Sequence, residues 1–94
     1  MKVYELLAKP ESWTKKAPAR NKHGKEVNAS YSEATCWCLA GAICKLIEEV
    51  KIRASIYKQI HKEIDSEYTS TVDWNDAPER THQDVIDLCK KLDI

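Results

Sequence analysis

The sequence contains little of what an all-β protein needs. Glycine occurs twice and proline three times in 94 residues, whereas a chain of short strands requires a turn every few residues. No apolar run approaches the roughly 20 residues that span a bilayer, so we predict no membrane contact. A chain of this length is enough for one domain. We therefore expect residues 1–94 to form a single, mainly helical domain.

A secretion signal is also missing from the sequence. The apolar stretch 3–8 is too short and too interrupted by charge to be the core of a signal peptide. Four cysteines without such a signal are typical of reduced thiols in a cytoplasm. We therefore predict a cytoplasmic protein, and nothing in the sequence argues for disulfides.

There is no excess of positive charge, because the formal net charge is zero. The charges are unevenly spread, however: residues 1–30 contain seven Lys or Arg against three Glu, and residues 63–87 contain eight acids against one Arg. A basic stretch over residues 15–25 can contact the phosphates of a nucleic acid. Its candidate residues are Lys15, Lys16, Arg20, Lys22 and Lys25. Since DNA-binding proteins usually carry a positive excess, we favour the alternatives that the two ends of the chain attract each other or are simply solvated.

Apolar spacing predicts about four helices. A short one over residues 3–7 must end at Pro10. Residues 36–47 are apolar on nearly every side, so a helix starting near Ser30–Ser32 is expected to be the central one. Isoleucines at i+4 spacing mark residues 52–64. Thr81 and Asp84 form a capping box that opens the last helix.

The remaining segments read as a hairpin and a loop. Residues 19–28 resemble two short arms around a turn at Lys22–Gly24, where glycine supplies positive φ. Residues 66–80 are expected to be a loop, with a β-prone piece at 69–72 that could pair with the hairpin. The predicted fold is therefore mainly α, with helices around a central apolar helix and a small β-hairpin.

The pair Cys36 and Cys38 suggests two kinds of chemistry. Two cysteines two apart on a helix point away from each other, so we predict no metal site and no cofactor. A cysteine in the first turn of a helix is favoured as thiolate, so Cys36 with His82 as base, oriented by Asp76, is a weak catalytic candidate. The simpler interpretation is a small buried apolar residue, and we lean against an enzyme.

The segment 74–81 concentrates an aromatic residue, turn formers, a proline and a helix cap. The favoured interpretation is structural: Trp74 packs in the core, Asn75 and Asp76 hold the turn, and Arg80 pairs with Asp76 or Glu79. The alternative is a polar recognition patch. Its candidate binding residues are Trp74, Asn75, Asp76 and Arg80.

Two stretches, residues 34–43 (ATCWCLAGAI) and 74–81 (WNDAPERT), resemble a family of short bacterial and phage proteins of unknown function. The resemblance extends to Trp13 and to residues 19–27, but not to residues 52–70. It implies no activity, cofactor or catalytic residue, and it implies a bacterial or phage intracellular setting. The leading hypothesis is a small non-enzymatic module that binds an unknown protein partner. The cysteine-dependent enzyme and the nucleic-acid-binding protein are the alternatives.

Overall fold

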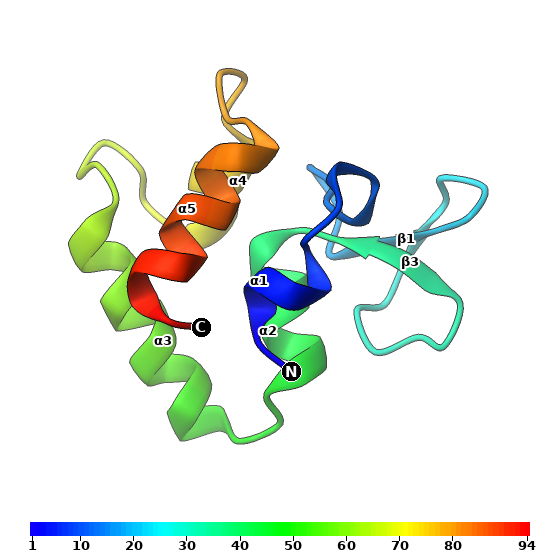
Figure 1. Cartoon of the computed structure of the whole chain (residues 1–94), viewed down its shortest axis with the longest axis horizontal. Helices are drawn as coiled ribbons and strands as arrows, with labels where there is room; N and C mark the ends of the chain where they lie inside the picture. Colours follow the sequence, from blue (N-terminus) through cyan, green and yellow to red (C-terminus); the bar gives the residue numbers. More distant parts are fainter.

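The computed structural model describes all residues from 1 to 94 and contains five α-helices and a three-stranded sheet. In chain order the elements are α1 (Val3–Leu6), a 3-10 turn (Pro10–Ser12), β1 (Ala19–Asn21), β2 (Glu26–Val27), β3 (Ala34–Trp37), α2 (Leu39–Leu46), α3 (Val50–Glu63), α4 (Thr71–Asp76) and α5 (His82–Leu92). Figure 1 shows α3, α4 and α5 on one side, the sheet on the other, and α1 with α2 between them. A helical fold with a small sheet is thus confirmed in outline, with one helix more than expected.

The predicted hairpin is present, and a third strand extends it. β1 pairs antiparallel with β2, with Ala19 opposite Val27, and Gly24 in the turn has φ of 79°. β3 pairs with the other edge of β1 and places Cys36 opposite Arg20. The expectation of a helix from Ser30–Ser32 is therefore wrong. A two-stranded hairpin is marginal alone, and residues 34–37 satisfy its free edge instead of starting a helix.

The central helix α2 begins at Leu39, and Cys38 is its N-cap. The Cys38 sulfur accepts a hydrogen bond from the Gly41 backbone N–H at 3.2 Å. Gly41 allows the loop before β1 to approach, since a Cβ there would lie 1.9 Å from the carbonyl oxygen of Pro18. That same oxygen accepts from the Cys38 backbone N–H at 3.2 Å. The sheet half and the helical half are therefore joined at the first turn of α2.

The core lies between α1, α2, α3 and α5. Its fully buried side chains include Leu7, Leu39, Ile43, Ile60 and Val85. The isoleucine ladder is only partly a core stripe, because Ile56 and Ile60 are buried whereas Ile52 is 51% exposed. The two termini meet, as the Tyr4 N–H donates to the Ile94 carbonyl at 3.3 Å. None of the helices combines the length and the apolar character that a membrane span requires.

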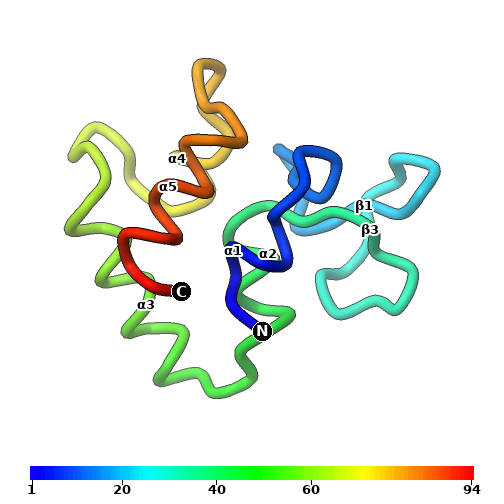
Figure 2. The backbone as a smooth tube through the Cα atoms, viewed as in Figure 1, coloured from blue at the N-terminus to red at the C-terminus, as the bar shows by residue number.

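The helix α4 was not predicted, since residues 66–80 were expected to be a loop. Ser70 caps it by accepting from the Asp73 N–H at 3.1 Å, so residues 69–72 lead into a helix and do not pair with the hairpin. The tube in Figure 2 passes from the end of α3 behind α5, and α4 contacts both α2 and α3. This short helix brings the segment 74–81 against the start of α2.

Candidate functional site

The Asn75 side chain links the segment 74–81 to the rest of the fold through hydrogen bonds. This side chain is fully buried. Its Oδ1 accepts from the Trp13 indole N–H at 2.7 Å and from the Leu39 backbone N–H at 3.0 Å. Its Nδ2 donates to the Thr14 carbonyl at 3.1 Å and to Asp76 at 3.0 Å. An amide has two acceptor and two donor positions, so Asn75 is saturated and holds α4 to α2 and to the N-terminal segment.

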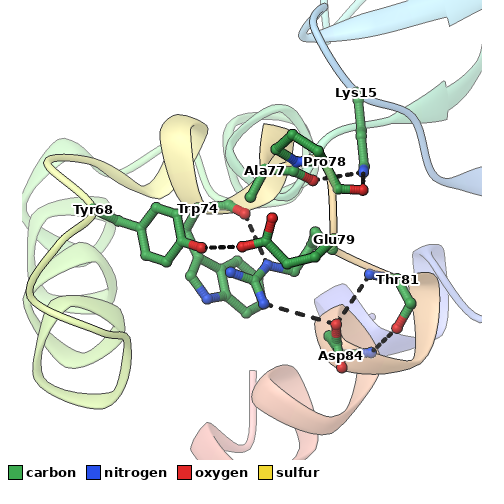
Figure 3. Close-up of polar contacts among 9 residues, drawn as sticks. Lys15, Tyr68, Trp74, Ala77, Pro78, Glu79, Thr81 and Asp84 are labelled. Atoms are coloured by element: carbon green, nitrogen blue, oxygen red, sulfur yellow. Dashed lines mark hydrogen bonds and ion pairs between the residues drawn. The ribbon is translucent and has the colours of Figure 1, made fainter.

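Trp74 and Arg80 form a stacked pair, and Figure 3 shows Trp74 together with Tyr68. Trp74 is 7% exposed, and the Arg80 guanidinium lies 4.0 Å from the centre of its ring and 5.3 Å from that of Tyr68. The Arg80 Nε donates to the Trp74 carbonyl at 2.8 Å, and its Nη1 lies 3.7 Å from Asp84. Arg80 is thereby occupied by its own chain.

The sequence suggested that Arg80 pairs with Asp76 or Glu79. Both carboxylates have other contacts, and this prediction is therefore wrong. Glu79 accepts a hydrogen bond from the Tyr68 hydroxyl (Figure 3), which lowers the pKa of Glu79 and raises the pKa of Tyr68. Asp76 Oδ1 accepts from the Lys16 backbone N–H at 2.9 Å. The Arg80 side chain instead lies against α4 and reaches the Asp84 carboxylate on α5.

The capping box at the start of α5 is confirmed. The Thr81 side chain accepts from the Asp84 N–H at 3.1 Å, and Asp84 accepts from the Thr81 N–H at 3.0 Å. The backbone hydrogen bond from Thr81 is the main reason that the pKa of Asp84 is lowered. Together with Arg80, this box fixes the path from α4 to α5.

Cys36 and His82 have separate partners. Cys36 is half-buried on β3, with its sulfur 3.9 Å from the Arg20 carbonyl, and not in the first turn of a helix as expected. His82 begins α5, and its Nε2 lies 2.6 Å from the Leu7 carbonyl oxygen. The helix argument for a Cys36 thiolate is therefore wrong. No group of three or more His, Cys, Asp or Glu residues is placed to hold a metal ion.

The cations of the basic stretch divide into two sets. Lys15 Nζ donates to the Ala77 carbonyl at 2.7 Å, and Arg20 donates to Thr14 Oγ1 and to the carbonyls of Gly24 and Lys15, each at 3.1 Å. The side chains of Lys15 and Arg20 therefore stabilise the fold. Three cations are exposed: Lys16, Lys22 and Lys25. Nucleic-acid binding remains a prediction that depends on those three.

An apolar cavity of about 440 Å³, here called the apolar pocket, opens beside the first turns of α2. Its walls include Ala17, Cys38, Ala40 and Cys44, and Val72 of α4 closes one side. Burial raises the pKa of the Cys38 thiol, so this sulfur is neutral and belongs to the apolar wall. The charged members of the lining are Lys16 and Asp76. The pocket could not be predicted from the sequence, because its walls come from segments that are far apart in the chain.

Two further hollows adjoin the apolar pocket, and α4 contributes to all three. The acidic pocket, about 510 Å³, shares Asp76 with it and is lined by three more carboxylates: Glu67, Asp73 and Glu79. The polar pocket, about 330 Å³, shares Ala40 and Val72 with it and is lined by Tyr57, His61, Ser70 and Thr71. Because the apolar pocket shares lining residues with each of the other two, we call the three hollows together the α4 groove.

Comparison with known proteins places the chain in a family without assigning an activity. Residues 2–92 match the model of DUF6197, a family of unknown function, and the chain belongs to this family. The resemblance to a family of unknown function, inferred from the sequence, is thereby confirmed. No curated protein and no solved structure matches the chain.

Proposed function

We propose that this member of the family is a small non-enzymatic interaction module, whose α4 groove binds an exposed segment of a partner protein. The main support for this proposal is the position of Asp76 between two pockets. This one residue lines both the apolar pocket and the acidic pocket. A matching partner segment would insert an apolar side chain into the apolar pocket and place a basic side chain in the acidic pocket.

The apolar pocket has the properties of an anchor site. Its volume of about 440 Å³ falls within the roughly 300–1,000 Å³ of known ligand pockets, which are mostly apolar with a few polar groups. A buried anchor side chain supplies most of the affinity in many interfaces. The neutral Cys38 thiol and the small side chain of Ala40 leave room for an aliphatic or aromatic side chain here.

The acidic pocket supports a basic residue beside that anchor. Four carboxylates line it. Glu79 accepts a hydrogen bond from Tyr68, Asp73 accepts one from Thr69, and Asp76 accepts from the Asn75 amide. The side chain of Glu67 has no hydrogen-bond partner within the chain. The nearby cation Lys15 is held by backbone carbonyls. Complementary charge steers association and fixes the register of a bound segment. A Lys or Arg next to the apolar anchor is the complementary chemistry.

The experiment is a selection of displayed random peptides on immobilised wild-type protein. We expect enrichment of peptides with an aliphatic or aromatic residue followed or preceded by Lys or Arg. Ala40→Phe, which fills the apolar pocket, should abolish the enrichment. The matched control is Ala54→Phe, since Ala54 is an exposed alanine on α3.

The charge component is tested separately with Asp76→Asn. This change keeps the Oδ1 that accepts from the Lys16 N–H and removes the negative charge. Binding of the enriched peptide should weaken, and it should also weaken with added salt. Absence of any enriched peptide, or enrichment that survives Ala40→Phe, would overturn the proposal.

A further inference from the structure

Thr71 has a polar group that the fold does not use. The residue is 4% exposed, and its hydroxyl oxygen has no hydrogen-bond partner within the chain. Buried hydroxyls are nearly always paired, because burial without a partner costs free energy. Thr71 also lines the polar pocket. The hydroxyl oxygen itself has almost no accessible surface, so an external partner could pair it only if the side chain turned toward the pocket.

The other polar groups of that pocket are donors of the same kind. The Tyr57 hydroxyl lies 3.8 Å from the Cys44 sulfur, and an imidazole N–H is available on the exposed residue His61. The Ser70 side-chain oxygen caps α4 as an acceptor, which leaves its O–H as a further donor. Residues that carry hydroxyl and imidazole N–H groups thus line one hollow, and such groups suit a hydrogen-bond acceptor.

The position of the polar pocket identifies the source of that acceptor. Ala40 and Val72 line both this pocket and the apolar pocket. A segment with its anchor side chain in the apolar pocket would therefore bring its own backbone next to Thr71. We infer that the polar pocket is a second subsite of the α4 groove, in which the Thr71 side chain turns and donates a hydrogen bond to a backbone carbonyl of the partner segment.

This inference rests on the proposed function, and it is tested by Thr71→Val. Valine has the same shape without the hydroxyl. The probe is the most enriched peptide of the selection on wild-type protein, carrying a fluorophore. Loss of one hydrogen bond predicts binding that is weaker by about 3- to 10-fold. The melting temperature should not fall, since the hydroxyl is unpaired in the free protein. Thr35→Val, at an exposed position on β3, is the matched control.

The acceptor is located by replacing single backbone amides of the peptide with esters, whose carbonyls are weaker acceptors. One ester should weaken binding to wild-type protein and have a smaller effect on Thr71→Val. If Thr71→Val binds the peptide as wild type does, or is less stable than wild type, the subsite is refuted and the interaction proposal stands. If Ala40→Phe also leaves peptide binding unchanged, both the subsite and the proposed interaction function are refuted.

Discussion

Asn75→Asp is the sharpest perturbation of the scaffold, because it changes the donor end of the side chain and leaves its shape. The Oδ1 that accepts from Trp13 and Leu39 is retained. The donor Nδ2 becomes an oxygen facing the Thr14 carbonyl at 3.1 Å and the Asp76 carboxylate at 3.0 Å. Two hydrogen bonds are thus replaced by two contacts between acceptors.

The magnitude follows from burial. Each lost hydrogen bond costs about 1 kcal/mol, and a buried group left unpaired costs about 1–3 kcal/mol more. Because Asn75 is fully buried, we expect the free energy of unfolding to fall by about 3–5 kcal/mol. That is a large part of the roughly 5–15 kcal/mol typical of a small domain.

Urea unfolding followed by tryptophan fluorescence measures the change, with circular dichroism to check that the variant is folded in water. The control is Asn28→Asp, because Asn28 is exposed and its recorded hydrogen bonds use only its oxygen. A variant of Asn75 within about 1 kcal/mol of wild type would mean that its amide does not hold the fold. Asn75 would then be free to bind a ligand.

Three other outcomes are expected. Gly41→Ala should destabilise the fold by about 2 kcal/mol, since a clash with the Pro18 carbonyl outweighs the gain in helix propensity; an unchanged urea midpoint would contradict the close approach. Thr81→Ala should cost about 1 kcal/mol through the lost cap, and Thr81→Ser should restore it, as measured by thermal melting. Burial raises the pKa of Cys38, and that of Cys89 to about 12, so iodoacetamide at mildly alkaline pH should label neither in the folded protein and both in urea. Rapid labelling of native Cys38, detected by mass spectrometry, would mean that the wall of the apolar pocket is solvated.

The helices that the sequence predicted correctly are those with a local signal. The apolar spacing of residues 3–7, 52–64 and 82–92 reflects side chains that face one core, with the exception of the exposed Ile52. The Thr81–Asp84 box depends on residues three apart and is equally visible in the sequence.

The misplaced elements depend on distant contacts. Residues 34–37 form a strand because β1 has a free edge, and no local pattern reports that edge. The cap of Ser70 with Asp73 was a readable signal for α4, but a helix of six residues has too few positions for a periodic stripe. An incorrect start for the central helix then placed Cys36 at a helix terminus, and the catalytic hypothesis depended on that position.

The helix cap in the segment 74–81 was correctly expected. The expectation that Asn75 and Asp76 hold a turn is wrong, because both residues lie in α4 and their side chains bond the N-terminal segment. The saturation of Asn75 could not be predicted. Asn75 uses all its hydrogen-bonding positions only because residues 13, 14 and 39 converge on it in three dimensions. The α4 groove was missed for the same reason. It exists where Pro18 packs against Gly41 and leaves Ala40 open toward Val72.

The central claim is that a partner segment binds in the α4 groove. The most direct measurement is a heteronuclear NMR titration of the wild-type protein with the most enriched peptide from the selection. We expect the largest shifts at the backbone amides of Ala40, Cys44, Val72 and Asp76, with little change at Lys22 and Lys25 in the hairpin turn. Shifts confined to the hairpin, with the α4 groove unaffected, would contradict the account.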